Sequence, residues 1–104
     1  MIGHMSGTFS RVGRYAVYQC CTAYFYARLK PIHPKAPWTA TVQYYGHGAW
    51  HRLGAGTYHF ELDGDAAIFL NASSGYRFRV RGRFDGDADH LPASSPWSYF
   101  RFVK

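Results

Sequence analysis

The sequence predicts an all-β fold, a two-sheet antiparallel β-sandwich of seven to eight strands. Aromatic residues make up 19% of the chain, against three lysines and one glutamate, and aromatic side chains suit half-buried pleated surfaces. Residues 76–84, Tyr-Arg-Phe-Arg-Val-Arg-Gly-Arg-Phe, alternate without a break, as a strand with one buried face requires. Turn signals recur about every 8 to 12 residues, and no stretch between them offers a helix of three turns.

A single domain is expected, because 104 residues are enough for one core and too few for two. The opening residues, Met-Ile-Gly-His-Met-Ser-Gly, are typical of a cloning leader, so we expect residues 1–7 to be disordered and residues 8–104 to form the domain. No signal peptide is visible in this sequence. The longest apolar stretches, such as residues 66–70, fall far short of the ~20 residues that span a membrane.

The first half of the domain reads as strands separated by one loop. Residues 8–12 suit an edge strand, and residues 15–29 suit one long strand or two short ones. The expected inward side chains of the latter are Ala23, Phe25, Ala27 and Leu29. Residues 30–38 contain three of the five prolines and predict a loop, because proline has no backbone N–H to donate to a neighbouring strand.

The second half reads as strands joined by glycine and aspartate turns. Residues 39–45 and 49–53 flank Gly46-His47-Gly48, which predicts a hairpin, with Val42 and Tyr44 facing inward. The remaining elements are a turn at 54–56, strands at 57–62 and 66–70 around a turn at 63–65, the 76–84 strand, a polar loop at 85–96 and a last strand at 97–103. Phe100 and Phe102 are expected to face inward.

The two cysteines, Cys20 and Cys21, are adjacent in the sequence. Adjacent strand side chains point to opposite faces, so a bridge between them would need an unusual turn. We expect two free thiols. Cysteine usage therefore does not identify the redox compartment.

Three segments resemble the bacterial immunoglobulin-like repeat domains of secreted multidomain proteins. Residues 42–53 are similar to their middle hairpin, residues 75–81 to their penultimate strand, and residues 84–90 with Ser94-Ser95 to the segment before their last strand. Residues 8–104 fall within the resemblance. It implies an immunoglobulin-like sandwich in a larger exported protein, where it acts as a spacer, adhesion or ligand-presenting module beside neighbouring domains at the cell surface. It also places Tyr76 at a tyrosine corner, with its hydroxyl bonded to the backbone.

The arginines of the 76–84 strand are the main candidate binding residues. In the order of strands that the resemblance implies, they lie between aromatic residues of two neighbouring strands. The candidates are Arg77, Arg79, Arg81, Arg83, Arg101, Trp97, Tyr99 and Tyr45. Guanidinium groups stack on aromatic rings and also bind phosphate and carboxylate, so the pattern fits both a self-contained Arg–aromatic ladder and an anion-binding surface.

The net charge of +6 also suits an anionic partner. The first 60 residues carry six basic residues and no acid, whereas the remainder is balanced. Acidic glycans and teichoic-acid-like polymers of the cell envelope are the expected partners, with nucleic acid less favoured and plain solubility as the simpler explanation.

Carbohydrate binding is a second hypothesis, because flat rings stack on sugars. Its candidates are Trp38, Trp50, Trp97, Tyr45 and Tyr58. One tryptophan of a sandwich is normally buried between the sheets. We expect Trp50 to be that residue and Trp97 to be exposed.

Metal, cofactor and catalytic sites are not expected. Asp85, Asp87 and Asp89 begin a calcium-loop pattern, but His90 replaces the required glycine and Pro96 the bidentate glutamate. His47, His51 and His59 lack further ligands nearby for zinc. Ser94 or Ser95 with His90 and Asp89 is too close in sequence for a catalytic triad. The sequence therefore predicts a non-enzymatic module.

Overall fold

The computed structural model describes residues 1–30, 35–88 and 90–103, and these residues form strands and connections without a helix. The smaller sheet has the order β1 (Ile2–Ser6), β4 (Thr22–Arg28) and β7 (Asp65–Asn71). The larger sheet has the order β2 (Ser10–Val12), β3 (Tyr15–Gln19), β10 (Ser98–Val103), β8 (Arg77–Phe84), β5 (Pro37–Gly46) and β6 (Ala49–His59), with β9 (Ala93–Ser94) paired to β8.

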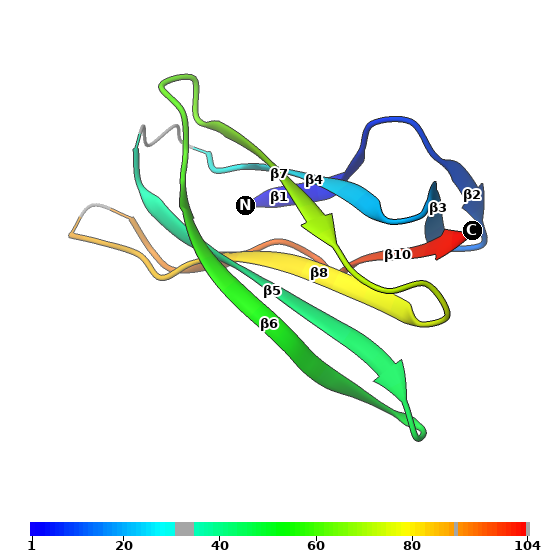
Figure 1. Cartoon of the computed structure of the whole chain (residues 1–104). Coiled ribbons are helices and arrows are strands. Elements are labelled where there is room, and N and C mark those ends of the chain that lie inside the picture. The colour runs from blue at the N-terminus through cyan, green and yellow to red at the C-terminus, as the bar shows by residue number, and fades with distance from the viewer. Residues whose placement is uncertain (31–34, 89, 104) are drawn as a thin grey trace.

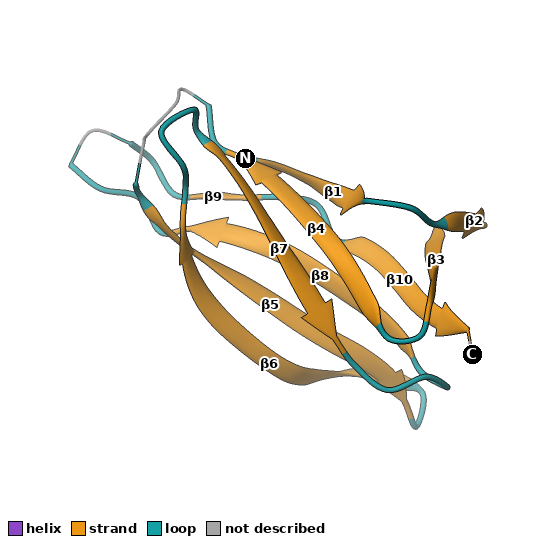
Figure 2. Cartoon of the chain, turned by 45° about the horizontal axis from the view of Figure 1, so that its top comes forward, coloured by secondary structure: helices purple, strands orange, loops and turns teal. Residues whose placement is uncertain are grey.

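The two sheets lie one above the other, as in a sandwich (Figures 1 and 2). Neighbouring strands are antiparallel except β3 and β10, which pair in parallel. The all-β, two-sheet prediction is confirmed, but the described residues form ten strands rather than seven to eight, and the parallel β3–β10 pair departs from the expected antiparallel arrangement. Within the described ranges, no helical segment has the length and apolarity that a membrane crossing requires.

The core lies between the sheets and is predominantly aromatic. Trp38 is its largest fully buried side chain, only 1% exposed, and it stacks on Phe60 with ring centroids 5.6 Å apart. Phe25 and Tyr58 pack on the same indole from the smaller sheet and from β6. Trp38 is therefore the tryptophan buried between the sheets, and the expectation that Trp50 fills this place is wrong.

The alternation predicted for three strands is confirmed by burial. The inward side chains of β4, β8 and β10 are buried: Ala23, Phe25, Ala27, Phe78, Val80, Phe84, Phe100 and Phe102, followed after β4 by Leu29. Gly82 continues this face on β8, and a Cβ there would lie 2.5 Å from Met1 Cε and 3.1 Å from Trp38 Cε3. The glycine thus leaves the space that the Met1 side chain and the indole fill.

The β5–β6 hairpin is confirmed at its turn but not along its length. His47 and Gly48 form a two-residue turn with φ of 52° and 77°, the left-handed region that such a turn requires. The predicted turn at 54–56 is absent, because β6 continues from Ala49 to His59. A register shift opposite Val42 and Gln43 leaves Leu53 unpaired as a bulge.

The first seven residues belong to the fold, contrary to the expectation of disorder for them. β1 pairs with β4 over five positions, and Met5 is buried. Gly3 makes this approach possible, because a Cβ on it would lie 2.5 Å from Phe25 Cζ. The predicted loop at 30–38 lies partly outside the described residues, and its last part is the start of β5.

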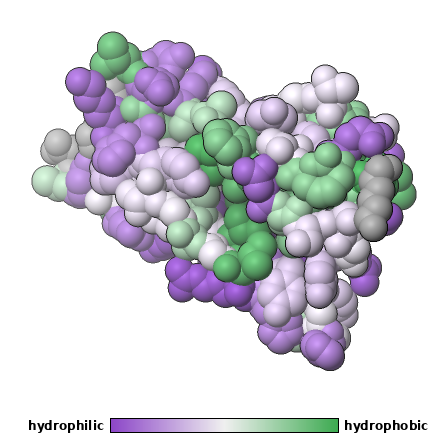
Figure 3. Space-filling view, viewed as in Figure 1, coloured by the Kyte–Doolittle hydropathy of each residue, from purple (hydrophilic) through white to green (hydrophobic). Residues whose placement is uncertain are grey.

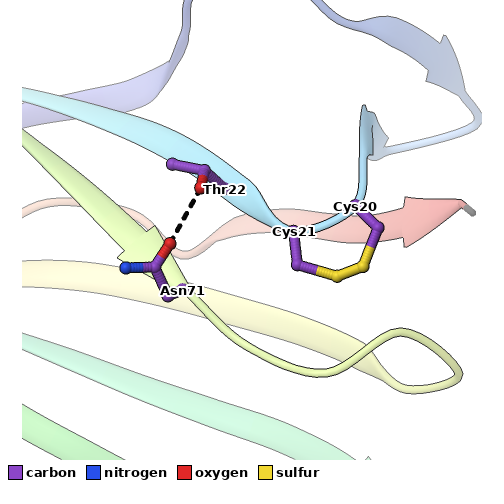
Figure 4. Close-up of a disulfide and its surroundings, with 4 residues drawn as sticks. All are labelled: Cys20, Cys21, Thr22 and Asn71. Carbon is purple, nitrogen blue, oxygen red and sulfur yellow. Dashed lines mark hydrogen bonds between the residues drawn. A yellow bond between two sulfur atoms is a disulfide. The ribbon is translucent and has the colours of Figure 1, made fainter.

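The cysteines also differ from the sequence expectation. Cys20 and Cys21 form a disulfide in the turn between β3 and β4, with a cis peptide bond between them (Figure 4). Beside it, Thr22 Oγ1 donates a hydrogen bond of 2.8 Å to Asn71 Oδ1 and joins the adjacent ends of β4 and β7. The expectation of two free thiols is wrong.

The tyrosine that ties its hydroxyl to the backbone is Tyr18. Its hydroxyl donates to the carbonyl oxygen of Ser6 at 2.5 Å and also lies 3.3 Å from that of Tyr24. Burial raises the pKa of Tyr18 above its ordinary value. Tyr76, the sequence candidate, is instead 52% exposed and packs edge-on against Tyr44 with its ring centroid 5.5 Å away.

Candidate anion-binding face

The outer face of the larger sheet gathers the predicted arginines and aromatic residues. β8 lies between β10 and β5, as the sequence interpretation required. Arg77 is paired in register with Arg101 and Tyr45, and Arg79 with Tyr99 and Gln43. We call this surface the Arg–aromatic face, with the members Arg77, Arg79, Arg81, Arg83, Arg101, Trp97, Tyr99, Tyr45, Trp50 and Arg14.

Three arginines of β8 lie over aromatic rings. The guanidinium carbon of Arg77 is 4.8 Å from the centroid of Tyr45. That of Arg79 is 4.5 Å from Trp50 and 4.2 Å from Trp97, and that of Arg81 is 4.5 Å from Trp97. An exposed contact of this kind contributes about 0.5–1 kcal/mol. The rings therefore fix the arginines in place.

Two members of the face were missed by sequence reasoning. Arg14 places its guanidinium carbon 3.9 Å from the Tyr99 ring, because the parallel pairing of β3 with β10 brings Tyr15 beside Tyr99. No local pattern in the sequence indicates this pairing of the two chain ends. Trp50 reaches the face through the β5–β6 hairpin, where it contacts Tyr45 and Tyr99 with centroids 5.3 and 5.9 Å away.

The positive charge of the face is largely unneutralised. Arg83 is the member with a carboxylate partner, since its Nε lies 2.9 Å from Asp85 Oδ1. Arg79 Nε donates to the neutral Gln43 Oε1 at 2.7 Å. Within the described residues, Arg77, Arg81 and Arg101 form no ion pair. No hydrogen bond to a described side chain occupies the N–H groups of Arg77 and Arg81, so these donors are available to an acceptor.

Two hollows adjoin Arg77. One has a volume of about 300 Å³ and is lined by Gly75, Tyr76, Arg77, Arg101 and Phe102. The other has a volume of about 260 Å³ and is lined by Arg14, Tyr15, Tyr45, Trp50 and Arg77. Each hollow thus combines two arginines with aromatic surface.

The carbohydrate candidates do not share one surface. Trp38 is buried in the core, and Tyr58 lines an apolar groove of about 350 Å³ between β6 and β7. The space-filling view shows apolar side chains gathered on this side of the molecule (Figure 3). Leu53 of β6 and Phe69 of β7 are exposed. Trp97 is half-buried rather than exposed, because Arg79 and Arg81 cover its ring.

Among the described acidic residues, Asp85 alone forms an ion pair with an arginine of the face. Arg28 binds Asp65 through Nε to Oδ1 and through Nη2 to Oδ2 at 2.9 Å, which ties β4 to β7 on the smaller sheet. The hydrogen bonds from Arg28 lower the pKa of Asp65.

Asp87 Oδ1 lies 3.0 Å from His90 Nδ1, and Asp89 falls outside the described residues. Among the described residues, no cluster of three or more His, Cys, Asp or Glu side chains is arranged to hold a metal ion.

In comparisons with known proteins, no family model, no curated protein and no solved structure matches this chain.

Proposed function

We propose that this chain is a non-catalytic, immunoglobulin-like module of an exported bacterial protein that binds an anionic polymer on its Arg–aromatic face. The order of strands supports the immunoglobulin-like part. The chain leaves the smaller sheet after β4, builds β5 and β6 in the larger sheet, returns for β7 and leaves again for β8. In immunoglobulin domains the strands divide between two sheets by similar crossings. The resemblance of three segments to bacterial repeat domains supports the exported, cell-surface setting.

One observation carries the binding proposal: guanidinium groups are fixed over aromatic rings on a face where Arg77, Arg81 and Arg101 have no described carboxylate partner. Cationic side chains that are already held in place lose little conformational entropy when an anion binds. Their combined field also steers an anionic polymer toward the face.

The same contacts favour recognition by charge over stacking. Arg79 and Arg81 cover Trp97, and Arg77 covers Tyr45, so these rings are occupied. Neutral sugars and nucleic-acid bases need open aromatic surfaces to stack on. An acidic glycan or another anionic polymer of the cell envelope therefore fits the face better than neutral carbohydrate or nucleic acid.

A spacer role is the second candidate function, and the ring contacts favour it. In that case the arginines and rings satisfy one another and stiffen the sheet, and no ligand is needed. The two functions differ in whether the arginines are available to a polymer.

Two triple variants with equal loss of charge separate these functions. Arg77→Gln, Arg79→Gln and Arg81→Gln together remove the ring-stacked arginines of β8. Arg11→Gln, Lys30→Gln and Lys35→Gln together remove exposed cations elsewhere. We expect the first variant to elute from a sulfated-polysaccharide column at much lower salt than the second, with circular dichroism showing both folded. Equal elution of the two variants would leave only a net-charge effect and refute the binding proposal.

A further inference from the structure

Arg77 and Arg101 are like charges placed directly opposite each other. They are register partners on the antiparallel strands β8 and β10, and both are exposed. Directly opposed residues have Cβ atoms about 4.5–5.5 Å apart, and like charges in this position are destabilising. Neither residue forms an ion pair with another described residue, so this repulsion is not compensated within the described chain.

Two other arginines of the face have polar partners that reduce their need for an anion, whereas Arg81 has, among the described side chains, only its contact with the Trp97 ring. Arg83 binds Asp85, and Arg79 binds Gln43 and two rings. Arg101 forms no hydrogen bond, ion pair or ring contact with another described side chain, whereas Arg77 is held on Tyr45. One guanidinium of the pair is thus fixed and the other is free to turn toward a ligand.

A hollow of about 300 Å³ lies at this pair. Gly75, Tyr76 and Phe102 complete its wall. Gly75 has a φ of 96°, and apart from its chain neighbours no atom lies within 4 Å of the place where a Cβ would stand. Arg77 and Arg101 are both exposed, so an anionic group can reach them from solvent.

We propose that Arg77 and Arg101 together form the primary anion site of the face, and that it takes a tetrahedral oxyanion, the sulfate or phosphate ester of a polysaccharide. This inference rests on the proposed function. Two guanidinium forks on separate strands approach an anion from different sides, and each fork binds a pair of oxygens. A sulfate or phosphate monoester presents three unesterified oxygens in different directions, so the two forks share one of them, whereas a carboxylate presents two oxygens in one plane.

The second hollow extends the site to a neighbouring sugar. It shares Arg77 and adds Arg14, Tyr45 and Trp50. Val17, Arg101, Arg77, Tyr45 and Trp50 form one row across the strands. The polymer therefore runs across β10, β8, β5 and β6 rather than along one strand.

The direct test compares Arg101→Gln with Lys30→Gln, which also removes one positive charge but from an exposed residue outside the face. Affinity for a sulfated polysaccharide is measured by titration calorimetry. We expect Arg101→Gln to weaken binding about tenfold or more, the range for losing a charged hydrogen bond, and Lys30→Gln less than about threefold. Equal losses in the two variants would refute the Arg77–Arg101 site, while the triple-variant column result would still stand. Absence of binding by the unmodified protein would refute both proposals.

The same titration, repeated with three polymers, shows which anionic group the site prefers. A polysaccharide that carries phosphate monoesters and a carboxylated polysaccharide of matched charge density are compared with the sulfated one. Tighter binding of the sulfated or the phosphate polymer supports the proposal and identifies which ester is preferred. Tighter binding of the carboxylated polymer would contradict the tetrahedral assignment.

A stability measurement reports on the same pair without a polymer. We expect Arg101→Gln to melt at the same temperature as the unmodified protein or higher in dilute chloride, because it removes the repulsion. Sulfate at equal ionic strength should raise the melting temperature of the unmodified protein and of Arg83→Gln more than that of Arg101→Gln. An equal sulfate effect on all three proteins would reflect general salt exclusion and contradict the site.

Discussion

Arg79 lies over the ring of Trp97, with its guanidinium carbon 4.2 Å from the ring centroid, and the same carbon is 4.5 Å from the ring centroid of Trp50 on β6, beyond β5. These two tryptophans belong to the segment before β10 and to β6. One arginine of β8 therefore links aromatic side chains from both sides of the larger sheet.

The first prediction concerns this link. Arg79→Ala removes two cation–π contacts and the bond to Gln43, so we expect the free energy of unfolding to fall by about 1–3 kcal/mol. Arg83→Ala removes an exposed ion pair and should change it by less than about 1 kcal/mol. Urea unfolding of both variants checks the difference. If both variants are as stable as the unmodified protein, the stacked arginines do not stabilise the sheet.

The second prediction separates the two tryptophans. Trp38 is fully buried against Phe25, Tyr58 and Phe60, so Trp38→Ala should cost about 3–5 kcal/mol or prevent folding. Trp38→Phe should leave a folded protein of reduced stability if the alanine variant does not fold. Trp50 lies on the outer face of the larger sheet, so Trp50→Ala should lower the free energy of unfolding by clearly less. The melting temperatures of Trp38→Phe and Trp50→Phe give the comparison, and a greater loss at Trp50 would contradict the core.

The third prediction uses two strand glycines. A Cβ at Gly82 would lie 3.1 Å from Trp38 Cε3, whereas a Cβ at Gly54 would meet nothing within 4 Å. Gly82→Ala should therefore lower the free energy of unfolding by about 1–3 kcal/mol through overpacking. Gly54→Ala should be neutral or stabilise by up to about 1 kcal/mol, because alanine restricts the unfolded chain. Similar values for both would show that the indole does not fill the space at Gly82.

The fourth prediction concerns pH. Hydrogen bonds from Arg28 lower the pKa of Asp65 in the folded state below its ordinary value of 3.8, which the unfolded chain retains. The unfolded state thus binds the proton more tightly, so the ion pair stabilises the fold above about pH 4 and this contribution is lost as the pH falls through the lowered pKa.

Asp65→Asn should accordingly be less stable than the unmodified protein at pH 7, and the difference should shrink as the pH is lowered below 3.8. Glu61→Gln is the control, because this exposed carboxylate forms no ion pair with a described residue. Thermal melts across the acid range provide the measurement. A difference that stays constant with pH would contradict the role of the ion pair.

The alternation of the 76–84 strand was enough to predict most of the candidate site. Because successive side chains of a strand alternate between its two faces, the period of two places four arginines on one face, whichever strands lie beside it. The strand order that the resemblance implies adds Tyr45, Tyr99 and Arg101. Burial of Phe78, Val80 and Phe84 confirms the opposite face.

The positions of Trp38 and Trp50 could not be predicted in this way, because a bulge lies between Trp50 and Tyr58 on one strand. With Leu53 unpaired, the alternation of β6 changes face: Trp50 contacts Arg79 outside, whereas Tyr58 packs on Trp38 inside. The glycines at 54 and 56 predicted a turn, but in the structure they lie within this long strand. Neither feature has a local sequence signal.

Pairings between distant segments were also hidden from the sequence. β1 pairs with β4, and β3 pairs in parallel with β10 at the far end of the chain. Both depend on packing of the whole sandwich, so the first seven residues and Arg14 were left out of the fold and of the face.

The central claim, that the Arg–aromatic face binds an anionic polymer, is tested most directly by nuclear magnetic resonance of the arginine side chains. The Nε–Hε signals are followed while a short sulfated oligosaccharide is added to the intact protein. We predict the largest shift changes at Arg77, Arg81 and Arg101, and little change at Arg28, which Asp65 already binds. Unchanged signals on the face, or changes as large at Arg28, would contradict the account.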